Sequence, residues 1–259
     1  MKDLLGTQEL WYPLQFMGIT HQASGVDIHI LKSTWLSMAV LLILLLVGRY
    51  FIARPTSIGG TIVRTVIRNL IDLIEQSVGK FVFRYYTFIS SIFIFIMACN
   101  WIGLIPGIEE PTKDLNTTLA LGLIAFFYAQ KEIIKIHGFA SYLKEYFMPF
   151  SFVFPLNLLA GLAVLPLKLL GELASIISIS FRLFGNIFGG AIITSIYQQA
   201  VSGSILFHIL GLITGLEFIL TLFFILFEGF LQAFVFSILA LTNIAMAVQQ
   251  EAEHEEAQL

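Results

Sequence analysis

The chain has 259 residues, of which 58% are hydrophobic and only 12% are charged. Soluble domains carry about a quarter charged residues, so this composition excludes an ordinary soluble globular domain. The net charge of −3 gives no reason to expect a nucleic-acid partner, and the single Cys99 excludes an internal disulfide and a cysteine metal cluster. Because the apolar runs are continuous and do not alternate with polar residues, we predict an all-α polytopic membrane protein.

Residues 1–33 form the predicted N-terminal segment. They lack the basic start and apolar middle of a cleavable signal peptide, so we expect them to be retained on the outer side of the membrane. The first spanning helix is predicted over residues 34–54, because its apolar run is about as long as the bilayer core requires. Arg49 lies near the end of this run, where a long side chain can reach the polar interface.

An amphipathic interfacial helix is predicted over residues 56–80. At about 100° per residue, apolar side chains such as Ile62 and Val66 fall on one half of the helix. Charged side chains such as Arg64 and Arg68 fall on the other half. A helix of this kind lies on the membrane surface or packs against the cytoplasmic side of its own subunit, and the sequence leaves both alternatives open.

Two further spanning helices are predicted within residues 85–137. The first ends in a Pro-Gly turn, and a polar, mostly acidic loop, IEEPTKDLNTT, follows on the outer side. The next span is weaker because Lys131 interrupts it, and we expect its lysines to lie at the interface. Basic residues gather after the first and third spans, which predicts an outer N-terminus and a cytoplasmic C-terminus.

Residues 155–248 form two apolar stretches separated by the polar turn QQAVSGS. Each has about 40 residues and is about 60 Å long as a regular helix, twice the hydrocarbon thickness of a bilayer. Each stretch is therefore either broken into two pieces or one arm of a long, strongly tilted helical hairpin. Pro166 permits a kink in the first arm. The acidic tail, residues 249–259, is interpreted as a solvated end.

Polar side chains form one stripe along each predicted arm, within an arc of about 80° of the helix. A strip of small residues, Gly171, Ser178, Gly185 and Gly189, neighbours the first stripe and is typical of a tight helix interface. His208 points away from the second stripe and is interpreted as an interfacial residue. The first stripe holds Lys168, Glu172, Ser175, Arg182 and Asn186, and the second holds Thr214, Glu217, Thr221, Glu228, Gln232 and Asn243.

Ionisable side chains inside a membrane indicate function, because their burial is costly. Arg182 keeps its positive charge at any working pH, whereas Glu172, Glu217 and Glu228 can take up and release protons. The combination suggests an ion path whose two halves are kept apart by a permanent cation. The structural alternative is an internal salt bridge, such as Arg182 with Glu228, that only holds the hairpin together.

Three segments carry a resemblance to a known family: SFRLFGN at 180–186, NWIGLIPG at 100–107 and LQAFVFSILAL at 231–241. With them the chain resembles subunit a of the rotary F-type ATP synthase, the static membrane subunit that sits against the ring of c subunits. The resemblance covers the chain from the first span to the end, in matching order. It implies that the partner charge of Arg182 is an acidic carboxylate on a passing c subunit.

The resemblance also implies the remaining roles. Gln232 corresponds to a glutamine close to the arginine across the hairpin, and Asn186 to the asparagine of the signature. The chain is then a non-catalytic subunit without cofactor or metal, with the nucleotide site on other subunits. Its implied partners are the c-subunit ring, the peripheral stalk subunit b, the other ATP synthase subunits and the lipid bilayer. The candidate half-channel residues are Glu172, Glu217, Glu228, Lys168, Ser175 and Ser178.

The sequence departs from the family pattern at the outer half-channel pair, and the Lys-Pro pair common just before the signature is Ser175-Ile176 here. Many members carry an acidic residue or histidine nine positions after the arginine and another seven before the glutamine, and these positions are Ala191 and Ile225 here. Glu228 and Glu217 are the candidates to replace that pair. We also expect Lys168 and Glu172, one helical turn apart, to form a local ion pair at the inner half-channel.

Two other function classes remain open. A self-contained secondary ion transporter or channel predicts a substrate site and usually paired repeats, and the sequence shows no internal repeat. A purely structural membrane subunit predicts that the intramembrane charges are dispensable. The expected location is a bacterial inner membrane, with thylakoid or mitochondrial membranes as alternatives. The ring, absent from this chain, decides between proton and sodium coupling.

Overall fold

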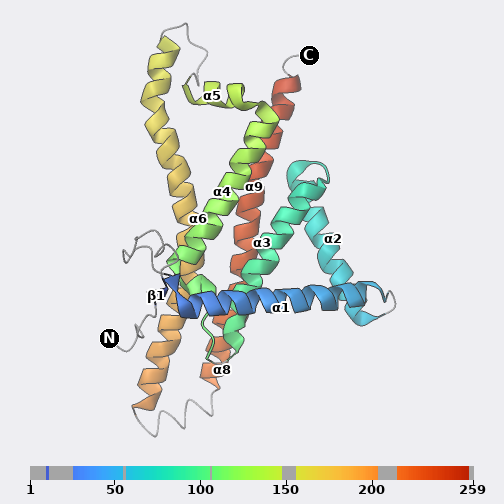
Figure 1. The fold of residues 1–259 in the computed structure, drawn as a ribbon, viewed down its shortest axis with the longest axis vertical. Helices are drawn as coiled ribbons and strands as arrows, with labels where there is room; N and C mark the ends of the chain where they lie inside the picture. The colour runs from blue at the N-terminus through green and yellow to red at the C-terminus, as the bar shows by residue number, and fades with distance from the viewer. Residues whose placement is uncertain are drawn as a thin grey trace.

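The computed structural model describes residues 10–11, 26–54, 57–105, 107–147, 156–203 and 215–256. The described chain is almost entirely helical, which confirms the predicted all-α class (Figure 1). A two-residue antiparallel ladder pairs Leu10 with Asp27 just before the first helix. The elements are β1 (Leu10–Trp11), β2 (Val26–Asp27), α1 (Ile28–Ile52), α2 (Ile58–Val78), α3 (Phe83–Trp101), η3 (Ile102–Leu104), η4 (Pro111–Lys113), α4 (Leu115–His137), α5 (Phe139–Phe147), α6 (Leu156–Ser202), α8 (Leu216–Thr221), the π-helix η5 (Leu222–Glu228) and α9 (Gly229–Glu256).

Four helical stretches are long and apolar enough to cross a membrane: 28–52, 83–104, 160–202 and 216–246. The first of them begins at Ile28, before the predicted start at residue 34. The predicted third span forms a helix, α4, but is not among the four, because polar residues occupy both of its ends. These stretches confirm the prediction of a polytopic membrane protein.

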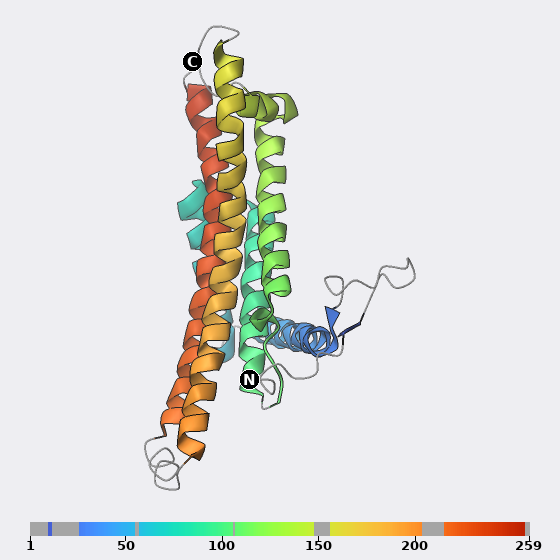
Figure 2. The same ribbon diagram turned by 90° about the vertical axis from the view of Figure 1, so that its left-hand side faces the viewer.

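The long hairpin consists of two continuous arms. The first arm, α6, is one helix of 47 residues with Pro166 inside it, and the second runs through α8, η5 and α9. Figure 2 shows the two arms side by side, with α4 beside them. The alternative of a broken first arm is therefore wrong. At 1.5 Å per residue α6 is about 70 Å long, so it fits a bilayer only when tilted.

The helix α1 lies across the long axis of this hairpin (Figure 1). The two cannot both follow the membrane normal. Because the 25 residues of α1 match the thickness of a bilayer, the arms of the hairpin are the tilted members. Between them, α3 packs against α9, and α4 packs against α6 and α9.

The two ends of the amphipathic helix α2 lie in different environments. Ser57 caps its N-terminus by accepting a hydrogen bond from the Gly60 N–H at 3.0 Å. Ile74 and Val78, near its C-terminus, are buried in the core, so this end packs on its own chain. Its N-terminal apolar side chains remain exposed. Ile58, at 83%, is the most open of them, so this half is available to lipid or to another chain.

An ion pair between α3 and α4 was not predicted from the sequence. The Arg84 guanidinium contacts the Glu132 carboxylate and donates a hydrogen bond to the Tyr85 hydroxyl at 3.3 Å. The Glu132 side chain is 1% exposed, whereas that of Arg84 is 41% exposed. The pair explains how an acidic side chain is accommodated inside the helix bundle.

We expect Arg84→Met to lower the thermal midpoint of the detergent-solubilised protein more than Glu132→Gln. The first change leaves a fully buried carboxylate unpaired, and breaking such a pair from one side costs about 3–5 kcal/mol. The second change leaves a cation that still reaches the surface. The double variant Arg84→Met/Glu132→Met should recover most of the loss. A midpoint for Arg84→Met at or above that of Glu132→Gln would contradict this account.

Candidate functional site

Arg182 lies near the middle of α6, on a face that its own chain leaves open. Arg182, Ser175 and Ser178 are exposed, and no atom outside the local helix lies within 4 Å of a Cβ built on Gly171, Gly185 or Gly189. These positions lie before and after Arg182 at helical spacing, so they form one open strip around it. The small-residue strip is therefore not an interface within this chain.

The two polar stripes meet one turn beyond Arg182. The Asn186 side-chain amide donates a hydrogen bond to the side-chain oxygen of Gln232, Oε1, at 2.7 Å, which links α6 to α9. Gln232 is 3% exposed, and its Nε2 has no hydrogen-bond partner among the described residues. Asn186 thus holds the Gln232 amide in place through its oxygen, and the Gln232 Nε2 stays available to donate a hydrogen bond.

The other predicted site residues lie at different levels of the hairpin. Lys168 and Glu172 are partly buried on α6. Glu217, exposed at the start of α8, accepts a hydrogen bond from Gln198 of the opposite arm at 2.8 Å. Glu228 ends the π-helix and is partly buried. Thr214 and His208 lie outside the described residues.

The alternative of a salt bridge within the hairpin is not observed. Arg182 and Glu228 are both described, and they form no ion pair with each other. Within the described part of the chain, no three His, Cys, Asp or Glu side chains gather where they could hold a metal ion.

The segment NWIG of α3 anchors the π-helix of the second arm. The Asn100 side-chain amide donates to the Gly229 carbonyl oxygen at 2.9 Å, and Trp101 Nε1 donates to the Leu226 carbonyl oxygen at 3.1 Å. The Thr112 hydroxyl donates to Asn100 Oδ1 at 2.6 Å, so Asn100 is satisfied on both sides. A Cβ on Gly229 would lie 3.0 Å from the Asn100 Cβ, so glycine permits this close approach. π-helices frequently occur at functional sites, and here α3 holds one in place.

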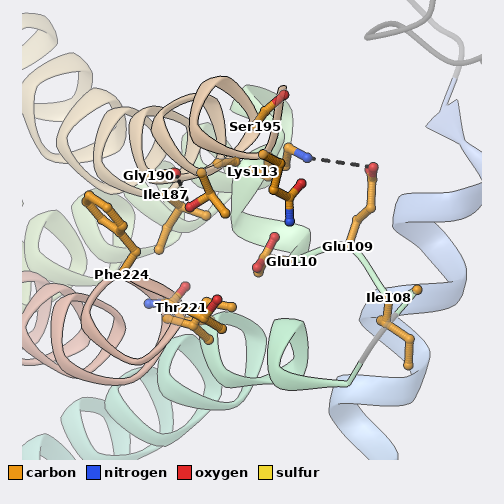
Figure 3. A pocket seen from close by; sticks show the side chains of 15 residues that line it. Ile108, Glu109, Glu110, Lys113, Ile187, Gly190, Ser195, Thr221 and Phe224 are labelled. Carbon is orange, nitrogen blue, oxygen red and sulfur yellow. Dashed lines mark hydrogen bonds and ion pairs between the residues drawn. The ribbon is translucent and has the colours of Figure 1, made fainter. Parts of the chain in front are cut away.

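A cavity of about 380 Å³ opens beside this anchor (Figure 3). Its walls come from α6, from η5 with the end of α8, and from the loop between α3 and α4. Ala191 and Ile225, two of the positions that depart from the family pattern, both line it. Neither Glu217 nor Glu228 does, although Glu217 is bonded to the lining residue Gln198.

The charges of the cavity come from the loop between the helices. Glu109, Glu110 and Lys113 line it, and Lys113 forms an ion pair with Glu109 at 3.6 Å. Burial raises the pKa of the Glu110 carboxyl, an effect that the nearby Lys113 partly opposes. The sequence predicts this loop only as an acidic connection on the outer side of the membrane. No periodicity in the loop relates it to the hairpin, so the pattern gave no signal for Glu110.

Comparison with known proteins gives a consistent result. The family model described as ATP synthase A chain matches residues 31–245. The chain is 30% identical to ATP synthase subunit a 2 of Acaryochloris marina, over 83% of each chain. It is 35% identical to ATP synthase subunit a of Syntrophobacter fumaroxidans, over 73% of this chain and 70% of the relative. It is 38% identical to ATP synthase subunit a of Aliarcobacter butzleri, over 66% of each chain.

We expect Asn100→Ala to loosen the second arm at its π-helix. The change leaves the Gly229 carbonyl and the Thr112 hydroxyl without their buried partner, at about 1–3 kcal/mol for each group. Thermal melting and limited proteolysis in detergent would register the loss. Asn116→Ala is the matched control, because Asn116 is exposed and makes only a 3.4 Å contact with Asp114. Equal behaviour of the two variants would refute the anchoring role.

Proposed function

Because the chain belongs to the ATP synthase A chain family, we propose that it is the static ion-translocating subunit of the ATP synthase membrane sector. In this role it couples the flow of protons or sodium ions to rotation of a c-subunit ring, and the nucleotide chemistry takes place on other subunits. The single observation that carries the proposal is Arg182, exposed on an open strip of small residues in the middle of an apolar helix.

The physical role of Arg182 follows from its chemistry. A guanidinium does not lose its proton at working pH, so it holds an approaching ring carboxylate in the ionised form. It also repels a cation that would pass straight from one half-channel to the other. Ions then cross only by binding to the ring and travelling around it. One charge moving through 100 mV releases about 2.3 kcal/mol, and this free energy drives the rotation of the ring.

The open strip around Arg182 suits a moving helical partner. Gly171, Gly185 and Gly189 leave room for another helix to approach closely, as helix contacts in membranes require. Large apolar side chains, among them Ile177 and Phe181, are exposed beside the strip and suit lipid or the apolar flanks of ring helices. The Asn186–Gln232 bond keeps the two arms in register behind it.

The two half-channels are assigned to opposite ends of the hairpin. Lys168, Glu172, Ser175 and Ser178 precede Arg182 on α6 and belong to the inner half-channel. The cavity at the other end, with Glu217 and Glu228 near it on the second arm, belongs to the outer half-channel. This assignment places the start of α1 and the loop between α3 and α4 outside, and the C-terminus in the cytoplasm.

The chain is an integral membrane protein, and we assign it to a bacterial inner membrane. Its partners in this proposal are the c-ring, the peripheral stalk subunit b and the remaining ATP synthase subunits. The exposed N-terminal half of α2, with its polar face opposite, suits the inner membrane surface or one of these subunits.

Arg182→Ala should reduce ATP-driven proton uptake into inverted vesicles to background while the complex stays assembled. The reason is that a ring carboxylate no longer meets a fixed cation between the half-channels. Arg68→Ala, an exposed arginine on α2, is the control and should stay within about twofold of wild type. A parallel sodium titration names the ion, because sodium competes with protons only at a sodium-binding ring. Undiminished uptake in Arg182→Ala would remove the basis of the proposal.

Gly185→Leu should block activity without preventing insertion of the chain. Among the described residues, no atom outside the local helix lies within 4 Å of a Cβ at this position, so the side chain fits the subunit but closes the strip against the ring. Gly48→Leu, at an equally open glycine of α1, is the matched control and should retain uptake. The measurement compares uptake at equal amounts of membrane-inserted chain. Full uptake in Gly185→Leu would mean that no helix passes this strip.

A further inference from the structure

We infer that Glu110 carries the protons of the outer ion path, from the loop wall of the cavity that faces Ala191 and Ile225. The inference rests on the proposed function and adds a residue to it. In this chain neither hairpin wall offers an ionisable side chain at positions 191 and 225. The loop between α3 and α4 supplies one, Glu110, which lines the same cavity (Figure 3).

The packing of the loop holds Glu110 in this position. Glu110 directly precedes η4. The next two residues, Pro111 and Thr112, are both buried and fix its position. The Glu110 carboxylate occupies the space that a Cβ on Gly103 would fill. Any larger residue at position 103 would displace it. Thr112 is bonded to Asn100, so the same network that anchors the π-helix also fixes the loop.

The cavity has the composition of a water-filled passage. Thr194, Ser195, Gln198 and Thr221 line it with amide and hydroxyl groups that can bond to water. A space of about 380 Å³ holds about ten water molecules. A carboxylate in such a space exchanges protons with water on one side and with the deeper path on the other.

The deep end of the cavity approaches the centre of the hairpin on both arms. On the first arm the lining residue Ile187 directly follows Asn186. On the second arm Asn100 bonds to Gly229, which lies about one turn before Gln232. Asn186 and Gln232 are themselves hydrogen-bonded. The lining residues thus come within one residue of Asn186 on α6 and, through Asn100, within about one turn of Gln232, although neither Asn186 nor Gln232 lines the cavity itself.

Glu110 suits proton transfer better than its neighbour Glu109. The Glu109 side chain is 62% exposed and pairs with Lys113, which is the environment of an ordinary surface carboxylate. Glu110 is partly buried, and burial raises the pKa of its carboxyl above the usual value. A carboxyl with a raised pKa takes up a proton more readily, as a proton carrier must. The charged groups around it are Glu109 and Lys113, with Glu217 reached through Gln198.

The test measures passive proton flow out of inverted vesicles, whose lumen corresponds to the outer side, with the catalytic sector removed. Glu110→Gln keeps the shape of the side chain but cannot release a proton, so we expect the flow to fall at least tenfold. Glu110→Asp retains a carboxyl and should keep most of the flow. Glu109→Gln is the matched control and should stay within twofold of wild type. The amount of chain in the assembled complex is measured for each variant.

The pH dependence separates a chemical role from a structural one. A carboxyl with a raised pKa stays protonated to higher pH, so wild-type flow should decline as the lumen pH rises through that pKa. Glu110→Gln should lose this step. An unchanged profile, or equal loss in Glu110→Asp and Glu110→Gln, would overturn the inference. Arg182→Ala is tested alongside: if it loses ATP-driven uptake while Glu110→Gln conducts normally, only the inference about Glu110 fails.

Discussion

A positive charge that cannot be neutralised by losing a proton must be neutralised by a partner, and this constraint organises the hairpin. Arg182 stands on an apolar helix, and no acid of the described chain pairs with it. Its surroundings are left open by glycines rather than closed by large side chains. In the proposed function this charge is compensated by a carboxylate of another subunit, so the subunit acts only within the assembly.

The rest of the fold serves to keep that open face in a fixed place. The two long arms are too long to stand upright in a bilayer, so they need support along their length. α3 and α4 provide it by packing against α9 and α6, and they are joined to each other by the buried Arg84–Glu132 pair.

The second arm shows how an irregular backbone is tolerated inside a membrane subunit. A π-helix leaves its carbonyl groups less well aligned than an α-helix, and unsatisfied carbonyls are costly away from water. Trp101 of α3 donates to one of these carbonyls, that of Leu226, and Asn100 donates to the carbonyl of Gly229 directly after the π-helix. Thr112 completes the bonding of Asn100. The cavity lies beside this arrangement, so one polar network supports both the backbone and the proposed ion path.

The amino-acid sequence alone determined the membrane class, the helices and the arginine stripe, because hydrophobic length and helical periodicity are local properties. It left open whether the first arm was broken and which surface α2 covered. It also gave no sign of Glu132 pairing with Arg84, or of Asn100 meeting Gly229 at a separation of 129 residues. Only the tertiary structure placed the α3–α4 loop on the cavity that Ala191 and Ile225 also line. The placement of a loop beside a distant helix depends on how the elements pack and not on any repeat in the chain.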